Sequence, residues 1–262
     1  MNSTTYVVAD TITMTRRTLS HMLRNPAPTL IATLGTPILL LVLMYNLFDG
    51  VIQQAGTVAG QGSYINYLTP GLILIAALYG LGMATLRANT DMTQGIIARF
   101  RTMSIARISV LNGHVLGSTI GTLVGIAVLT VLAWLTGFRP NSEPLALIAA
   151  LGLIILCVWS MTWLGIAVGV SSKSPDAANS TLFLLYILPF LSSAFVPTSS
   201  MTSVVAWIAE NQPFSPIIDT LRGLLMGTPI GTRWIVAIAW CLVFTLIGSL
   251  VARAAYNRQT NT

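Results

Sequence analysis

Six long stretches of this sequence contain no charged residue, and they constrain the fold more than any other feature. They are Pro28–Phe48, Tyr67–Leu86, Ser109–Gly137, Pro144–Val170, Asn179–Val196 and Trp234–Ala252. A helix that crosses the hydrocarbon core of a bilayer needs about 20 apolar residues, and each stretch is near that length or longer. The sequence lacks the short segments of alternating polarity that build a transmembrane barrel. We therefore predict an all-α integral membrane protein in which residues 1–262 form a single domain with six transmembrane helices.

The distribution of basic residues predicts how these spans are oriented. Only 8% of the chain is charged, and the chain holds 13 Lys and Arg residues. Ten of these 13 fall in segments on the same side as the N-terminus, and three fall on the other side. The positive-inside rule then places both termini in the cytoplasm, with the chain in the bacterial plasma (inner) membrane. The net charge of +6 is accordingly assigned to contact with anionic lipid rather than with nucleic acid.

The sequence contains no motif for catalysis or for ATP binding. Its single lysine, Lys173, lies in "GVSSKS", which lacks the glycine that a phosphate-binding loop requires before the lysine. Cys157 and Cys241 both lie within apolar stretches, so we expect neither a disulfide nor a metal site. We therefore predict that the chain is not an enzyme and holds no cofactor. If transport is active, ATP and magnesium must be bound by a separate polypeptide.

A segment before the first span has the pattern of an amphipathic helix. Between Thr5 and Arg24, Val8, Ile12 and Leu19 share one face of a helix, and Arg17 lies on the opposite face. Such a helix is expected to lie in the membrane interface, with its apolar side toward the acyl chains.

The segment between the fifth and sixth stretches, Pro197–Arg233, is too long for a simple turn and has its own apolar pattern. The sequence "QPFSP", Gln212–Pro216, divides this segment in two. We therefore predict two short extracellular helices that dip toward the membrane.

The most basic part of the chain is the connection between the second and third stretches, Asp91–Arg107. Read as a helix, this connection places Ile96, Phe100 and Met103 on one face and Arg101 on the opposite one. Composition alone leaves two interpretations open: a positively charged loop that faces lipid headgroups, or a short helix that docks into a groove on a partner.

The residues of this connection resemble a motif of the membrane subunits of type-2 ABC exporters, in particular the daunorubicin-resistance-type permeases. The family motif reads "DxxxGxxxRFRSLPIAR", and the chain reads "DMTQGIIARFRTMSIAR". "SSAFVPTSSM", Ser192–Met201, and "NQPFSPIIDTLRGLLMG", Asn211–Gly227, match the same family. The chain departs from the motif at Ala98, where the family often has an acidic residue, and at Ser104, where it often has proline.

This resemblance implies a membrane subunit of an ATP-driven exporter for a hydrophobic or amphiphilic substrate such as a drug, an antibiotic or a lipid. Two cytoplasmic ABC ATPase subunits and a second permease, either a copy or a homologue, would complete the complex. The implied ATPase-coupling residues are Asp91, Gly95, Ile96, Arg99, Phe100, Arg101, Met103, Arg107, Lys173 and Asp176. Two alternatives stay open: a proton-coupled multidrug carrier, and an exporter of polysaccharide or lipid-linked glycan from the same ABC class.

Small residues and aromatic residues in the spans suggest further roles. Glycines that would let helices pack closely within one subunit are Gly113, Gly117, Gly121, Gly125, Gly165 and Gly169. Candidates for the substrate pathway are Tyr79, Phe183, Tyr186, Pro189 and Phe190, although packing against lipid or the core is the commoner role of such aromatic side chains. We expect Pro189 to kink the fifth span. His114, near the inner end of the third stretch, is expected to be a structural hydrogen-bonding residue rather than a proton relay.

Overall fold

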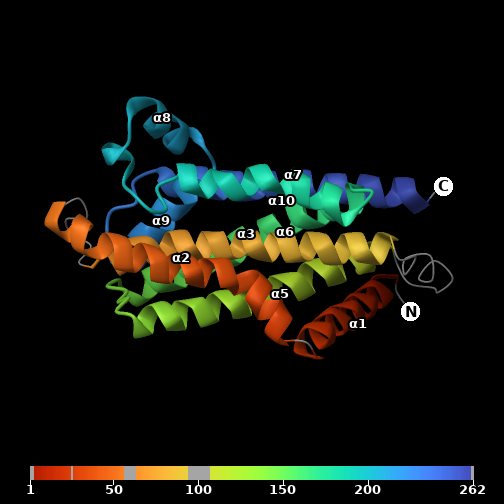
Figure 1. Ribbon diagram of the computed structural model, residues 1–262. Helices are drawn as coiled ribbons and strands as arrows, with labels where there is room; N and C mark the ends of the chain where they lie inside the picture. The colour runs from red at the N-terminus through yellow and green to blue at the C-terminus, as the bar shows by residue number, and fades with distance from the viewer. Residues whose placement is uncertain (1–2, 25, 56–62, 94–106, 261–262) are drawn as a thin grey trace.

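The computed structural model describes residues 3–24, 26–55, 63–93 and 107–260, and every regular element in these ranges is helical. The α-helices, labelled as in Figure 1, are α1 (Ser3–Arg24), α2 (Pro26–Ala55), α3 (Tyr64–Thr93), α5 (Arg107–Leu135), α6 (Pro144–Ser171), α7 (Pro175–Ile187), α8 (Ser203–Asn211), α9 (Phe214–Met226) and α10 (Arg233–Thr260). Two 3₁₀-helices, η1 (Leu188–Leu191) and η2 (Thr198–Ser200), lie between α7 and α8. The prediction of an all-α protein is confirmed for the described residues.

Within the described ranges, five helices are long and apolar enough to cross a membrane. The candidate spans are Leu30–Phe48, Tyr64–Thr93, Ser109–Leu135, Pro144–Ser171 and Arg233–Arg258. They correspond to five of the six charge-free stretches of the sequence. The chain is therefore a multi-pass membrane protein, and the count of six spans stays a prediction.

The remaining stretch, predicted as a span over Asn179–Val196, folds differently from that expectation. The α-helix α7 begins at Pro175 and ends at Ile187, and η1 continues it only to Leu191. Pro189 lies in the first turn of η1, where its missing N–H removes a donor that an α-helix would need. The proline thus lies where the α-helix gives way to a 3₁₀ turn, and the expected kink of a fifth span at Pro189 stays a prediction.

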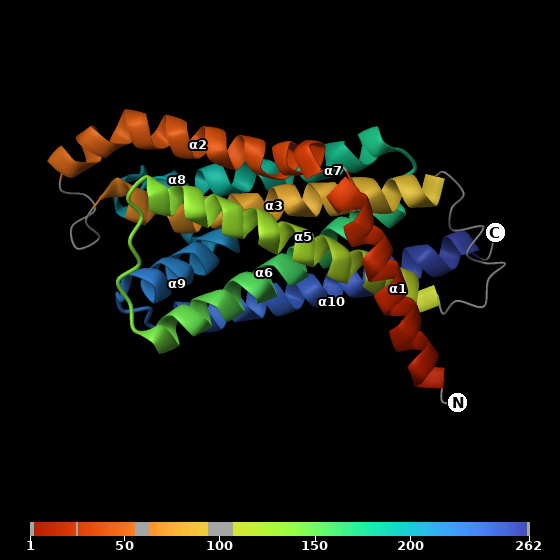
Figure 2. The ribbon, with the colours of Figure 1, turned by 90° about the horizontal axis from the view of Figure 1, so that it is seen from below.

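Helix α3 is the centre of the bundle. Of its candidate span 83% is buried, compared with 22% for that of α10. It packs against α2, α5, α6, α7 and α9, and Figure 2 shows it running between α2 and α5. Leu68, Leu72, Leu78 and Leu81 of α3 are fully buried in the main hydrophobic core. Helix α3 is therefore in contact with most of the other helices of the bundle.

The two ends of the bundle carry different parts of the chain. Both termini, the end of α3 and the start of α5 lie together, and we call this the termini end (Figure 1). Helices α8 and α9 lie toward the opposite end, which we call the hairpin end. The break predicted at Gln212–Pro216 lies between them, because α8 ends at Asn211 and α9 begins at Phe214. Helix α9 is buried along most of its length rather than resting on the surface of the bundle.

Helix α1 crosses α5 at the termini end (Figure 2). Met14 and Thr18 face this neighbour, whereas Ile12, on the predicted apolar face, is 62% exposed. The helix therefore packs on the bundle through a face adjacent to the predicted apolar one. Ile12 stays exposed, and the contact of the predicted apolar face with the membrane interface remains a prediction.

Candidate functional site

A carboxylate at the termini end joins three helices. Asp91, in the last turn of α3, lies with its Oδ2 atom 3.1 Å from Nη1 of Arg17 on α1 and 3.2 Å from Nε2 of His114 on α5. The Asp91 and His114 side chains are 14% and 11% exposed, and that of Arg17 is 45% exposed. Hydrogen bonds to an ionised group are stronger than neutral ones, so Asp91 is a fixed point between α1, α3 and α5. The contact agrees with the structural hydrogen-bonding role expected for His114.

Asn89, two residues before Asp91, connects α3 to the turn between α6 and α7, which is also at the termini end. Its Nδ2 donates to the carbonyl oxygens of Gly169, at 3.0 Å, and Ser172, at 2.8 Å. Both acceptors lie where α6 ends and the turn toward α7 begins. Asn89 is fully buried, and it is a residue that the sequence motifs did not single out. The only indication of this role in the sequence is that Asn89 lies two residues before the motif aspartate, Asp91.

The predicted coupling residues fall into three groups. Gly95, Ile96, Arg99, Phe100, Arg101 and Met103 lie outside the described residues. Asp91 and Arg107 lie on either side of that segment, at the end of α3 and the start of α5. Lys173 and Asp176 are exposed at the α6–α7 turn, where Ser174 caps α7 by accepting a hydrogen bond from the Ala177 N–H at 3.2 Å. The end of α3 thus leads into the first connection that the sequence predicted to couple, and through Asn89 it contacts the second.

The glycines of α6 lie against α3. A Cβ atom at Gly165 would lie 2.6 Å from the carbonyl oxygen of Leu81, and one at Gly169 would collide with the carbonyl of Thr85. The Thr85 hydroxyl also donates to the Gly165 carbonyl, at 2.8 Å. Backbone contact of this kind is possible only where a side chain is absent, so α3 and α6 pack as closely as two helices can.

The glycines of α5 lie against the N-terminal helices. A Cβ at Gly113 would collide with Met14, one at Gly117 would lie 2.6 Å from Cβ of Thr18, and one at Gly121 would collide with Met22. A Cβ at Gly125 would lie 3.5 Å from Cδ2 of Leu34 on α2, an ordinary contact distance. All these contacts are made within one chain.

The aromatic pathway candidates lie on or beside α7. The rings of Tyr79 and Tyr186 are stacked with 5.2 Å between their centroids. Phe183 is 64% exposed, and Phe190 is 52% exposed and stacks on Phe195. The structure therefore places one aromatic pair between α3 and α7 and two phenylalanines on the outer surface of the chain. Pro189 is buried.

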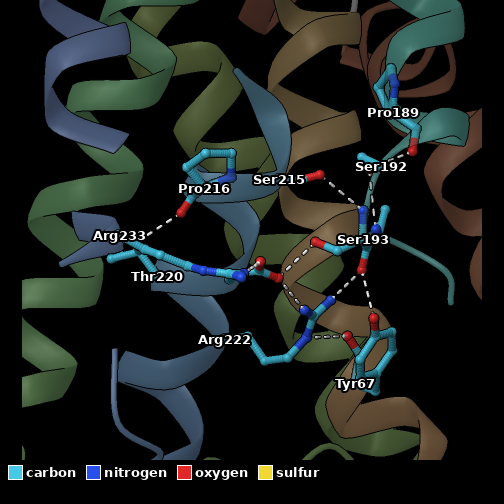
Figure 3. Close-up of polar contacts among 11 residues, drawn as sticks. Tyr67, Pro189, Ser192, Ser193, Ser215, Pro216, Thr220, Arg222 and Arg233 are labelled. Carbon is cyan, nitrogen blue, oxygen red and sulfur yellow. Dashed lines mark hydrogen bonds and ion pairs between the residues drawn. The ribbon is translucent and has the colours of Figure 1, made fainter. Parts of the chain in front are cut away.

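A second polar cluster, at the hairpin end, surrounds the buried guanidinium of Arg222 on α9 (Figure 3). Its side chain is only 6% exposed. Nη1 donates to Oδ1 of Asp219 at 2.8 Å, Nη2 to the Ser193 carbonyl at 2.7 Å, and Nε to the Tyr67 carbonyl at 3.2 Å. The guanidinium also lies over the Tyr67 ring, 3.7 Å from its centroid. One side chain thus holds α3, α9 and the turn after η1 together.

The other members of this cluster satisfy the remaining polar groups. The Ser193 hydroxyl donates to Oδ1 of Asp219 at 2.7 Å, and the Tyr67 hydroxyl donates to the Ser193 carbonyl at 2.9 Å. Arg233, at the start of α10, pairs with Oδ2 of Asp219. The positive-inside count treated Arg222 and Arg233 as loop charges, and the charge pattern gives no sign that one of them is buried. The available signal was the second family motif, which contains both Asp219 and Arg222.

The fold and these two clusters define a class: a multi-pass helical membrane protein whose central helix is held by polar contacts at both ends. A family model described as ABC-2 type transporter matches residues 9–226. The chain belongs to this family, which confirms the resemblance identified in the sequence.

The related proteins are permease proteins of ABC transporters. The chain is 27% identical to the daunorubicin resistance ABC transporter permease protein DrrB1 of Streptomyces coeruleorubidus, over 80% of this chain and 72% of that protein. It is 24% identical to the probable doxorubicin resistance ABC transporter permease protein DrrC of Mycobacterium tuberculosis, over 99% of this chain and 92% of that protein. The doxorubicin resistance ABC transporter permease protein DrrB of the same species is 26% identical, over 90% and 87% of the two chains.

Proposed function

We propose that the chain is the permease subunit of an ATP-driven exporter that moves a hydrophobic or amphiphilic drug, antibiotic or lipid out of the bacterial cytoplasm. The membership in the ABC-2 type transporter family and the names of the relatives, which refer to daunorubicin and doxorubicin resistance, support this proposal. In this proposal the chain crosses the plasma membrane six times, with α7 and η1 as the fifth span. Its termini end is cytoplasmic, in agreement with the excess of arginine there.

Two separate ABC ATPase subunits, which bind ATP and magnesium, would dock at the termini end, and a second permease would complete the complex. The contact area on this chain is the 91–107 coupling segment together with Lys173 and Asp176 of the α6–α7 turn. The observation that carries this proposal is the position of α3: Asp91 leads directly into the coupling segment, and Asn89 holds the α6–α7 turn. A movement of either connection therefore displaces the same helix.

Helix α3 is also suited to carry that movement across the membrane. Asp91 and Tyr67 are 24 residues apart on this helix, which corresponds to about 36 Å at a rise of 1.5 Å per residue. The close packing of Gly165 and Gly169 on α3 makes α6 move with it. At the far end, Tyr67 contacts Arg222. We infer that closure of the ATPases is transmitted along α3 to the turn after η1 and to α9.

The exposed aromatic side chains of α7 and η1 would line the substrate pathway between two permeases. Phe183 and Phe190 are more than half exposed in the single chain, and the stacked pair of Tyr79 and Tyr186 lies beside them. A second permease on this surface would enclose an aromatic, uncharged passage, which fits an apolar or amphiphilic cargo.

The experiment that tests this proposal uses the permease co-expressed with its ATPase. We expect the two to co-purify, and we expect transport into inverted vesicles to depend on ATP. Phe100→Ala and Arg101→Glu should lower ATP-dependent transport and substrate-stimulated ATP hydrolysis by about tenfold or more, which corresponds to at least about 1.4 kcal/mol of coupling. Arg253→Glu is the matched control, because Arg253 is an exposed arginine of α10 outside the coupling segment.

A proton-coupled carrier is the second candidate, and the contact between Asp91 and His114 is the observation that favours it. A carboxylate and an imidazole in contact within a membrane protein are typical of proton relays. Transport that continues without the ATPase and stops when the proton gradient is collapsed would establish this candidate. Normal ATP-dependent transport in both Phe100→Ala and Arg101→Glu would remove the coupling segment from the proposal.

A further inference from the structure

A groove opens between α5 and α6 in the half of the molecule near the hairpin end. The ribbons of the two helices cross in Figure 2 and diverge toward their connection, residues 136–143. The groove encloses about 550 Å³, and six of the side chains that line it carry the inference: Ile126, Thr130, Trp134, Phe138, Leu151 and Ile155. Sites for small molecules typically enclose roughly 300–1,000 Å³, so the groove has room for a ligand.

The groove has a buried base and an exposed opening. Ile126 and Phe138 are 4% and 2% exposed, whereas Trp134, Leu151 and Ile155 are between 43% and 56% exposed. The open side lies on the apolar outer surface of two membrane-spanning helices. An occupant can therefore enter sideways from the bilayer, and it must be apolar along most of its length.

A fixed positive charge lies at one end of the groove. The guanidinium of Arg139 lies over the Trp134 ring, 4.8 Å from its centroid. Nη1 donates to the carbonyls of Trp134, at 2.5 Å, and Phe138, at 2.8 Å. Among the described residues the N–H groups on Nη2 and Nε have no hydrogen-bond acceptor. The Arg139 backbone N–H donates to Oδ1 of Asn66 at 2.9 Å, which ties this cation to the start of α3.

The length of the groove matches one leaflet of a bilayer. Leu123 and Trp134, both of which line it, are 11 residues apart on α5. This corresponds to about 16 Å along a helix, or about half of the roughly 30 Å hydrocarbon core. Trp134 and Arg139 then lie where the acyl chains end, and tryptophan and arginine are the side chains that prefer this depth.

We propose that this groove binds one anionic phospholipid, with an acyl chain between α5 and α6 and the phosphate at Arg139. A cationic amphiphile of the same shape would place its charge against the guanidinium, so the sign of Arg139 selects the anionic headgroup. Arg139 is tied to the groove through the lining residue Trp134, whose ring its guanidinium covers, whereas Glu143, the other charged residue of the connection, is exposed and does not line the groove. This inference does not depend on the direction or the energy source of transport.

The fluorescence of Trp134 provides a test on the full chain in phosphatidylcholine nanodiscs. A small fraction of the lipid is replaced either by phosphatidylglycerol with brominated acyl chains or by phosphatidylcholine with the same chains. The fluorescence of Trp134 is obtained by subtracting the emission of the matching Trp134→Phe variant from the emission of each protein. We expect brominated phosphatidylglycerol to reach half-maximal quenching at a mole fraction about fivefold lower than brominated phosphatidylcholine does. One basic residue near an anionic lipid contributes about that factor in affinity.

Two matched variants and one cross-link decide the outcome. Arg139→Gln should make the two brominated lipids quench equally, and Glu143→Gln should keep the preference for phosphatidylglycerol. Size-exclusion chromatography and circular dichroism verify that both variants are folded. Equal quenching in the unmodified chain, or a preference that survives Arg139→Gln, overturns the proposal. A disulfide-linked dimer formed by Leu151→Cys would overturn it as well, because the groove would then be covered by a second copy of the chain.

Discussion

The two ends of α3 use the same kind of interaction in different surroundings. At the hairpin end Arg222 is 6% exposed and binds Asp219 together with two backbone carbonyls. At the termini end Arg17 is 45% exposed and binds Asp91. Removing one partner of a buried ion pair is strongly destabilising, whereas an exposed pair contributes little. The comparison indicates that the contacts of Arg222 are held more firmly and that the contact between Arg17 and Asp91 can open at lower cost.

The largest expected effect comes from removing the buried cation. Arg222→Ala removes the guanidinium donors to the Tyr67 and Ser193 carbonyls and the buried cation that pairs with Asp219, and we expect it to lower the free energy of unfolding by about 3–5 kcal/mol. Thermal unfolding of the purified protein in detergent would measure this loss. Arg222→Lys should recover part of it, because lysine keeps the charge but its compact ammonium does not reproduce the planar fork with which Nε, Nη1 and Nη2 each reach a separate acceptor. Arg139→Ala is the control. If it destabilises the protein as much as Arg222→Ala does, the burial of Arg222 is not what distinguishes the hairpin end.

The next largest effect is expected in the middle of α3, where this helix packs closely against α6. Gly165→Ala places a Cβ 2.6 Å from the Leu81 carbonyl, so α6 must move away from α3. We expect a loss of about 1–3 kcal/mol, as for other cases of overpacking, measured by the same unfolding experiment. Gly152→Ala is the matched control on the same helix, since nothing lies within 4 Å of its Cβ position. It should be neutral or stabilising, because alanine favours a helix over glycine. An equal loss in both variants would contradict the close contact between α3 and α6.

A smaller loss of stability is expected at the termini end itself. Asp91→Asn keeps the shape of the side chain and removes the charge that binds Arg17 and His114. We expect it to lower stability by about 1–2 kcal/mol, close to the contribution of hydrogen bonds to a charged group. The same change should reduce transport by the complex with its ATPase more than it reduces stability. Asp176→Asn, at an exposed site, is the stability control. Transport that falls only in proportion to the amount of folded protein would assign Asp91 a purely structural role.

The smallest effect is expected for the exposed partner. Arg17→Ala should cost less than about 1 kcal/mol, because salt and water screen a pair with a half-exposed cation. A double-mutant cycle on Arg17 and Asp91 should therefore give a coupling energy below about 1 kcal/mol that decreases further at high ionic strength. The corresponding cycle on Arg222 and Asp219 should give a larger value. Equal coupling energies in the two cycles would remove the difference between the two ends of α3.

The sequence predicted the parts of the fold that depend on local composition. Five of the six charge-free stretches are candidate spans, because the length of an apolar helix is fixed by consecutive residues. The break between α8 and α9 was predicted for the same reason, since proline acts on its immediate neighbours. The stretch Asn179–Val196 does not form one continuous α-helix, whereas Pro37 lies inside the continuous helix α2. Hydropathy alone does not show that the α-helix would end at Ile187.

The candidate site was predicted only in part. The motif identified Asp91, but its partner Arg17 is 74 residues away on a helix that was expected to lie on lipid. Arg222 was counted as a loop charge because its burial depends on Tyr67, which is 155 residues away. No pattern of neighbouring residues specifies such distant contacts.

The sequence by itself therefore determined the membrane class, the helical architecture and the family, because hydropathy, helix length and short motifs are local properties of the chain. Only the tertiary structure decided which charges are buried and which side chains hold α3 at its two ends. The physical reason is that burial and ion pairing depend on how helices that are far apart in the chain pack together. One arginine can be a loop charge or the centre of a buried cluster without any change in the residues beside it.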